Sequence, residues 1–348
     1  MTDGQTPSEQ LIEQAADRLA RGGLVAFPTE TVYGLGADAE NPEAIARIYA
    51  AKGRPSNHPV IVHVAPEAQV SHWARQVPPE AQALVEAFWP GPLTLILPRA
   101  HGIPPAVSGG QDSIGLRCPS HPVAQALLRR FAERKGGQGG VAAPSANKFG
   151  QVSPTHAEHV RHEFPELDED ALMVLEGGAS EVGIESTIID LSRLDQGLGP
   201  VLLRPGHITA EAIAQVLGTL PGRPDAAAPR VSGSLKAHYA PHTPLQLADR
   251  QGIEATVAEA ARSGERLAVV AFAPHDQCGA APALPANVDW QVCADQPAEY
   301  ARVLYALLRS LDKGGYGRIV LERPPATAQW QAVNDRVGRA AAAFNPHD

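Results

Sequence analysis

The chain contains few aromatic residues and few cysteines. Phe, Trp and Tyr make up 5% of its 348 residues, so its cores have to be built mainly from Ala, Val, Leu and Ile. The three cysteines, Cys118, Cys278 and Cys293, are far apart and odd in number, which indicates neither a disulfide framework nor a metal site. No run of about 18 apolar residues is present, and residues 1–10 lack the basic start and apolar run of a signal peptide. The sequence therefore predicts a cytoplasmic protein without a membrane span.

Common nucleotide-binding motifs are also missing. The sequence Gly-x-x-x-x-Gly-Lys-Ser/Thr is absent, which excludes a P-loop. The glycine-rich stretch 136–140 follows a predicted helix and leads into a predicted strand, so it does not fit a dinucleotide fingerprint and is interpreted as a surface loop. His238 and His242 are four residues apart, but Pro241 between them prevents a shared helix face. No metal site is predicted.

The negative charge is unevenly distributed along the chain. The formal net charge is −9 at pH 7; the whole excess lies in residues 1–222, whereas residues 223–348 are balanced. An extended nucleic-acid surface needs clustered Lys and Arg, so direct tRNA binding is not expected. Isolated basic residues in an acidic protein are better explained by a small, local anion site.

Strands and helices alternate along residues 1–220. Asn41, Pro42 and Glu43 form a strong helix start, and Gly53 ends that helix just after Lys52. Strands are expected at 24–27, 59–64, 93–97, 113–118, 141–143, 187–191 and 201–204, and helices at 10–22, 42–52, 79–88, 122–134, 155–164 and 209–218. This mixture indicates an α/β domain.

Residues 221–245 differ in composition, because five prolines bracket Ala and Ser with little periodicity. We interpret this segment as a linker. After it, helices are expected at 252–263, 298–311 and 327–343, and strands at 266–272, 287–292 and 317–322. Residues 246–348 are thus predicted to form a second, smaller α/β domain.

Lys52 and Arg54 flank the glycine that ends a predicted helix. Basic residues often occupy helix ends, because the dipole and the free carbonyl groups favour them, and this explanation suffices when the pair is considered alone. However, Lys52 continues the apolar stripe of Ile45 and Ile48, so its amine should face the core. A lysine beside an arginine fork suits a polyphosphate.

Ser113 and Arg117 share one face of a predicted strand, with Gly115 between them, and Ile114 and Leu116 on the other face belong to a core. An inward-facing arginine is costly unless it meets an anion. An internal salt bridge and a bound ligand explain this position equally well.

Other polar residues lie near strand ends. Arg204 allows the same two explanations as Arg117, and Ser145 and Asn147 can simply form a turn or a helix cap. His63, on a predicted strand, is more often a core histidine than a ligand when considered alone. Because α/β sheets bind ligands at the carboxyl ends of their strands, we expect the polar residues to meet there. The residues that converge at element ends or on inward faces are Thr31, Lys52, Arg54, Ser113, Arg117, Ser145, Asn147, Ser186 and Arg204.

Together these segments resemble the threonylcarbamoyl-AMP synthase family, whose catalytic part is called the YrdC-like domain. The matching pieces, in the family's order, are residues 28–36, 52–54, 58–64, 89–94, 113–117, 143–147, 185–188 and 203–206. Residues 236–241 and 321–336 resemble the two-domain members of the family. The resemblance implies a YrdC-like twisted mixed sheet with helices (1–220), an active-site-covering linker (221–245) and a small Rossmann-like α/β C-terminal domain (246–348).

The resemblance implies an L-threonylcarbamoyladenylate synthase, a nucleotidyltransferase that joins L-threonine, bicarbonate and ATP and releases pyrophosphate. Mg²⁺ is implied by ATP, and partner enzymes would transfer the threonylcarbamoyl group to an adenosine of tRNA. Lys52 and Arg54 are the implied catalytic residues. The implied ATP contacts are Lys52, Arg54, His58, Ser113, Ser145, Asn147, Ser153, Arg204 and Tyr239. The implied threonine contacts are Thr31, His63, Arg117, Ala143 and Ser186. The linker, with His238 and Tyr239, is expected to form an ordered lid over the nucleotide.

Two other functions were considered. An RNA-binding or ribosome-associated module would need a positive surface, and the acidic balance of residues 1–222 counts against it. A carbamoyl-transfer module of hydrogenase maturation would carry an acylphosphatase-like segment and zinc-finger cysteine pairs, and this sequence contains neither.

Overall fold

The computed structural model describes residues 7–275 and 283–344. The chain forms two compact units, Met1–Phe149 with Ser153–Ser234, and Gly150–Val152 with Leu235–Asp348. The domain bounds expected from the sequence stay a prediction. Cys118 and Cys293 are buried free thiols, and Cys278 lies outside the described residues.

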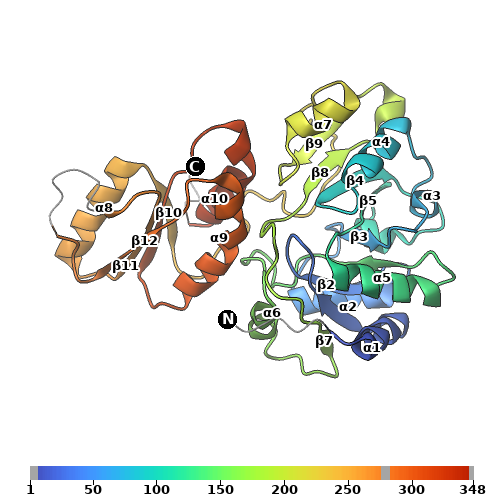
Figure 1. Ribbon diagram of the computed structural model, residues 1–348, viewed down its shortest axis with the longest axis horizontal. Helices are drawn as coiled ribbons and strands as arrows, with labels where there is room; N and C mark the ends of the chain where they lie inside the picture. The colour runs from blue at the N-terminus through green and yellow to red at the C-terminus, as the bar shows by residue number, and fades with distance from the viewer. Residues whose placement is uncertain (1–6, 276–282, 345–348) are drawn as a thin grey trace. The chain divides into compact units, whose positions relative to one another are not determined.

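The described part of the first unit contains a nine-stranded mixed sheet (Figure 1), in the order β7-β1-β2-β6-β3-β5-β4-β8-β9. Its strands are β1 (Leu24–Phe27), β2 (Gly34–Asp38), β3 (Ile61–Val64), β4 (Leu93–Pro98), β5 (Ser113–Arg117), β6 (Gly140–Ala142), β7 (Leu172–Val174), β8 (Thr187–Asp190) and β9 (Val201–Arg204). Its helices are α1 (Glu9–Ala20), α2 (Pro42–Lys52), α3 (Val70–Trp73), α4 (Pro79–Phe88), α5 (Pro122–Arg134), α6 (Ala157–Glu163) and α7 (Ala210–Leu217), with short 3₁₀ turns at Pro105–Ser108 and Leu194–Gln196. The predicted α/β fold is confirmed.

Helix α2 begins and ends where the sequence predicts. The Asn41 side chain accepts the N–H groups of Glu43 and Ala44, and Gly53 adopts the left-handed conformation (φ 62°) that ends the helix. Lys52 is therefore the last helical residue, and it lies on the buried stripe of the helix with Ile45 and Ile48.

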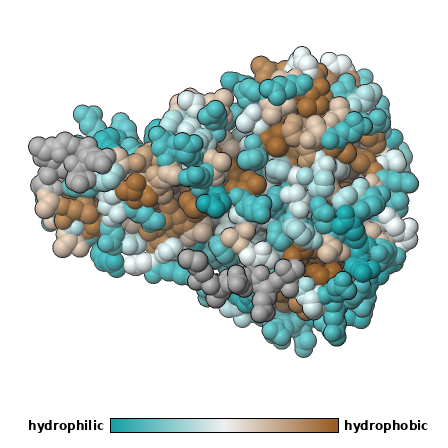
Figure 2. Space-filling model, in the orientation of Figure 1, coloured by the Kyte–Doolittle hydropathy of each residue, from teal (hydrophilic) through white to brown (hydrophobic). Residues whose placement is uncertain are grey.

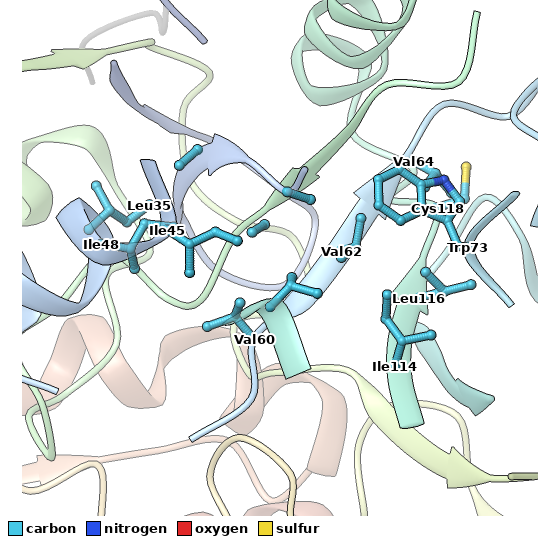
Figure 3. Close-up of a cluster of buried hydrophobic side chains, with 14 of the residues drawn as sticks. Leu35, Ile45, Ile48, Val60, Val62, Val64, Trp73, Ile114, Leu116 and Cys118 are labelled. Atoms are coloured by element: carbon cyan, nitrogen blue, oxygen red, sulfur yellow. The ribbon is translucent and has the colours of Figure 1, made fainter. Parts of the chain in front are cut away.

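One face of the sheet packs on the main hydrophobic core of the first unit. Side chains that alternate along the strands, among them Val62 and Leu116, point to this face and belong to the same core as α2 residues such as Ile45. Figure 3 shows these side chains along neighbouring strands, with Trp73 beside Val64. Ile114 also belongs to this core, as the sequence predicts.

The opposite face is covered in two different ways. Helices α1 and α5 lie over β1 and β6, where Phe27 and Val141 belong to a second core. Over the strands farther along the sheet, Ile96 of β4 and Ile188 of β8 pack with Val231, a residue of the predicted linker. The polar residues Thr94, Arg117 and Ser186, described below, lie on or beside these strands and their neighbour β5.

The second unit contains a four-stranded parallel sheet in the order β10-β13-β11-β12. Its strands are β10 (Leu245–Ala248), β11 (Leu267–Ala271), β12 (Val288–Val292) and β13 (Arg318–Glu322), and its helices are α8 (Arg250–Ser263), α9 (Pro297–Asp312) and α10 (Gln331–Ala342), preceded by a 3₁₀ turn at Ala328–Trp330. Helix α8 packs on one face of the sheet through Ile253 and Val257. The parallel order agrees with the expected Rossmann-like unit.

Three strands, β2, β7 and β10, were not predicted. Residues 223–239 hold turns and bends but neither helix nor strand, whereas β10 begins at Leu245, inside the expected linker. The interpretation of residues 136–140 as a surface loop is wrong for Gly140, which is buried as the first residue of β6.

The described helices include none with the length and apolar character that crossing a bilayer requires. Hydrophilic and hydrophobic residues are interspersed over the drawn face of each unit (Figure 2).

Replacing Gly140 by alanine, which adds one methyl group, tests the packing of β6. A Cβ at Gly140 would lie 2.5 Å from the Trp73 ring and 2.7 Å from Val62, so there is no space for it. We expect Gly140→Ala to lower the free energy of unfolding by about 1–3 kcal/mol, as overpacking does. Gly102 has no atom within 4 Å of such a Cβ, and Gly102→Ala should change it by less than about 0.5 kcal/mol. Urea denaturation of both variants provides the measurement, and equal stability of the two would contradict the packing described for β6.

Candidate active site

Lys52 joins two segments that are far apart in the sequence. The residue is 3% exposed, and its ammonium group donates hydrogen bonds to the backbone carbonyl groups of Ser145, at 2.6 Å, and of Asn147. Burial, and then the charge of Arg54, lower the pKa of Lys52 well below its usual value, while Glu163 and Glu185 act in the opposite direction. An anion bound here would stabilise the ammonium form.

Arg54 places a second positive charge in the loop after α2. Its side chain is 7% exposed, and Nη2 donates to the Pro59 carbonyl at 2.8 Å. Burial and the Arg54 charge also lower the pKa of His58, whose ring packs edge-on against Phe149 with centroids 5.4 Å apart. Two buried cations in neighbouring positions repel each other, and a phosphate group would offset that repulsion.

Arg117 is the centre of another polar cluster, on β5. The residue is 4% exposed, and its guanidinium forms an ion pair with Glu30, with Nη2 and Oε1 2.6 Å apart. Nη1 donates to the Thr31 hydroxyl at 2.8 Å, and Nε donates to the Gly91 carbonyl at 3.3 Å. Of the two explanations open from the sequence, the internal salt bridge is present. The ion pair and the two hydrogen bonds do not use all five N–H groups of the guanidinium.

His63 lies beside Arg117 in the register of the parallel strands β3 and β5. Burial, reinforced by the Arg117 charge, lowers the pKa of His63 to about 3. The imidazole is therefore neutral at physiological pH, with its edge toward Phe27 at a centroid distance of 6.1 Å. A neutral imidazole offers one hydrogen-bond donor and one acceptor.

Ser186, just before β8, completes this cluster. Its hydroxyl group pairs with Thr94 at 2.7 Å and accepts a hydrogen bond from Arg204 Nη2 at 3.1 Å. Arg204 Nη1 in turn donates to the Ser232 carbonyl at 3.0 Å, and this bond holds part of the predicted linker on the first unit.

The remaining expected residues of the first unit are buried or partly buried near these groups. Ser113 begins β5, and Ala143 follows β6 with its N–H bonded to the Ile61 carbonyl at 3.0 Å. The Ser153 hydroxyl donates to Glu185 Oε1 at 2.6 Å. Glu185 therefore accepts a hydrogen bond from Ser153, and its charge also acts on the pKa of Lys52.

The polar residues come from both ends of the strands, because the sheet is mixed. Strands β3 and β5 run parallel to each other, but β4 runs antiparallel to β5, and β6 antiparallel to β3. The end of β5 consequently lies beside the beginnings of β4 and β8. Arg117, from the end of β5, therefore lies near Thr94 and Ser186, from the beginnings of β4 and β8, and not only near other strand ends.

Tyr239 belongs to the second unit. Its φ of 62° lies in the left-handed region, a conformation that costs a non-glycine residue about 1–3 kcal/mol and is often kept at functional positions. Its ring contacts His238, with centroids 4.2 Å apart, stacks with Tyr305 at 5.7 Å, and has the Arg336 guanidinium over it at 5.4 Å.

Sequence reasoning missed Glu30 and Thr94 as members of the cluster around Arg117 and Ser186. Glu30 could have been found, since it is the single charged residue between Leu24 and Ala37 and an inward-facing arginine needs a counter-charge. Thr94 is buried on a strand, where nothing distinguishes it from an ordinary strand threonine.

Two family models match this chain. The model described as "Telomere recombination" matches residues 17–206, and the model described as "Threonylcarbamoyl-AMP synthase, C-terminal domain" matches residues 208–342.

Individual proteins resemble the chain over nearly its whole length. It is 38% identical over 351 residues to threonylcarbamoyl-AMP synthase of Bacillus subtilis, covering 98% of this chain and 96% of that protein. It is 36% identical over 344 residues to threonylcarbamoyl-AMP synthase of Pyrococcus abyssi, covering 96% and 94%. The crystal structure of Pyrococcus abyssi Sua5 complexed with L-threonine, 33% identical, aligns with a TM-score of 0.83 over 98% of this chain and 96% of that one. The chain belongs to the threonylcarbamoyl-AMP synthase family.

Proposed function

We propose that the chain is an L-threonylcarbamoyladenylate synthase, a nucleotidyltransferase that makes threonylcarbamoyl-AMP and pyrophosphate from L-threonine, bicarbonate and ATP. The observation that carries this proposal is the presence of two kinds of buried positive charge in the first unit. Lys52 and Arg54 form one group, and the Arg117 fork forms the other. The match to the C-terminal-domain model favours the synthase over both alternative interpretations.

The guanidinium of Arg117 suits the carboxylate of L-threonine. A planar fork can hold a carboxylate with two parallel hydrogen bonds. Thr31, His63 and Ser186 surround it with hydroxyl groups and a neutral imidazole, which can contact the amine and the hydroxyl group of the substrate. The backbone at Ala143 completes the proposed threonine contacts.

Lys52 and Arg54 suit the phosphates of ATP. In the proposed reaction the amine of threonine attacks the carbon of bicarbonate; the new N–C bond forms, a C–O bond breaks and water leaves, which gives a carboxylate on the nitrogen. The new carboxylate attacks the α-phosphorus, and the bond to pyrophosphate breaks. Such a transfer depends on positioning and on fixed charge rather than on a protein nucleophile. The two cations would neutralise charge on the phosphates, and the proposed nucleotide contacts are His58, Ser113, Ser145, Asn147, Ser153, Arg204 and Tyr239.

Mg²⁺ belongs to the proposal through ATP. The described residues contain no cluster of three or more His, Cys, Asp or Glu side chains that could hold a metal. This fits Mg²⁺, which usually keeps several waters and binds through substrate phosphates with one or two carboxylates. Glu185 is buried, and its charge acts on Lys52 together with that of the less buried Glu163; it is the residue we propose for that contact.

The product would serve partner enzymes that modify an adenosine of tRNA, and we propose a cytoplasmic location accordingly. The lid role of residues 221–245 stays a prediction.

The proposal is tested by measuring pyrophosphate release with all three substrates and with each one omitted. We expect release to require L-threonine, bicarbonate and ATP together, with threonylcarbamoyl-AMP as the co-product. Pyrophosphate release that is independent of threonine, or no release from folded protein, would contradict the proposed function.

Arg54→Ala tests the phosphate site. Because the guanidinium would act on charge that develops during transfer, we expect pyrophosphate release to fall by about 10²-fold or more, the scale of one lost charged contact in a transition state. Circular dichroism checks that the variant is folded. Near-normal turnover in folded Arg54→Ala protein would remove Arg54 from the catalytic residues.

Arg117→Lys tests the threonine site. The lysine keeps the charge but cannot grip a carboxylate with two parallel bonds. We expect the affinity for L-threonine to fall by about 10-fold or more, the scale of one charge-assisted hydrogen bond, while the affinity for ATP changes little. Isothermal titration with each ligand decides the point, and equal losses for both ligands would assign Arg117 a structural role.

A further inference from the structure

Glu30 is a buried carboxylate in the segment that follows β1. Its side chain is 5% exposed, and none of the proposed substrate contacts includes it. Taking a carboxylate out of water costs several kcal/mol unless it is paired and hydrogen-bonded. Glu30 has one ion pair and one hydrogen bond of this kind. Oε1 pairs with Arg117 Nη2 at 2.6 Å, and Oε2 accepts the N–H of Ser120 at 3.1 Å.

The backbone around Glu30 connects a third segment. The Glu30 carbonyl accepts the N–H of Val182 at 2.7 Å, and the neighbouring Thr29 carbonyl accepts the Ser180 hydroxyl at 3.0 Å. Residues 180–182 lead directly to Ser186. Glu30 thus lies where three segments meet, and these segments carry Thr31, Arg117 and Ser186.

The contacts of Arg117 leave part of its fork for a ligand. A guanidinium has five N–H groups: one on Nε and two on each terminal nitrogen. Within the described residues, Nε donates to Gly91, Nη1 to Thr31, and Nη2 faces Glu30. Nη1 and Nη2 therefore each keep at least one N–H group, and the two terminal nitrogens of a guanidinium can together hold a carboxylate with two parallel hydrogen bonds.

We propose that Glu30 is a positioning residue that orients the Arg117 guanidinium for the carboxylate of L-threonine. The ion pair with Glu30 keeps the Arg117 side chain in one rotamer. The remaining N–H groups of the guanidinium are then already oriented for the carboxylate when threonine binds. This inference rests on the function proposed above. It gives Glu30 an effect on threonine affinity that acts through Arg117 and leaves the ATP site unaffected.

Two substitutions separate charge from geometry. Glu30→Gln keeps the shape of the side chain but removes its charge, and Glu30→Asp keeps the charge but withdraws it by one methylene. We expect the Kd for L-threonine to rise by about 10-fold for Glu30→Gln and by a smaller factor for Glu30→Asp, with the Kd for ATP within about twofold of the unmodified chain. In turnover assays the KM for threonine should rise more than kcat falls.

Glu67→Gln is the matched control. Glu67 also pairs with an arginine, Arg129 at 2.9 Å, but the two side chains are 64% and 44% exposed on the surface. We expect this variant to bind both ligands as the unmodified chain does.

A double-mutant cycle with Arg117→Lys tests whether Glu30 acts through Arg117. Glu30→Gln combined with Arg117→Lys should bind threonine no more weakly than Arg117→Lys alone. If Glu30→Gln does not fold, Glu30→Asp provides the same comparison.

Three results would overturn the inference: an unchanged threonine Kd in folded Glu30 variants, an equal loss for ATP, or losses that add in the cycle. If the unmodified chain binds no threonine at all, the proposed function fails instead, so the two failures can be distinguished.

Discussion

The ion pair between Arg117 and Glu30 lies at the centre of the polar cluster on the sheet face. A guanidinium buried to this extent is strongly unfavourable without a counter-charge, and Glu30 supplies one from a loop 87 positions earlier in the chain. The same guanidinium donates to the Thr31 hydroxyl, and it adds to the effect of burial, the larger cause, in lowering the pKa of His63, which keeps that imidazole neutral.

The mixed direction of the strands determines where the chemistry can occur. Because neighbouring strands run in opposite directions, residues from the end of β5 and from just before β8 lie close together on one face. Gly115, between Ser113 and Arg117, has no side chain on this face. A Cβ there would lie 3.2 Å from Ile96, so a larger residue would crowd the neighbouring strand. In the same unit, Lys52 offers a compact charge and Arg117 a planar fork. A planar fork can hold a carboxylate with two parallel hydrogen bonds, whereas an ammonium group acts on phosphates as a compact point charge.

The sequence predicted local features well and long-range pairing poorly. Capping by Asn41 and Gly53 fixed the bounds of α2, and the apolar stripe of that helix correctly placed Lys52 on its buried side. The acceptors of Lys52, however, are backbone carbonyl groups more than 90 positions away, which no side-chain pattern reveals. Strand β2 was missed because its glycines and Asp38 have low strand propensity; it is a strand because β1 and β6 pair with it on both sides. Glu30 was missed as the partner of Arg117 for the same reason: their proximity is a product of the fold.

The central claim is that the two kinds of buried charge receive two different substrates. A crystal structure of the chain with L-threonine and a non-hydrolysable ATP analogue tests it most directly. The account predicts the threonine carboxylate on the Arg117 fork, opposite Glu30, and phosphate oxygens within hydrogen-bond distance of Lys52 or Arg54. A threonine carboxylate bound away from Arg117, or phosphates that contact neither Lys52 nor Arg54, would contradict it.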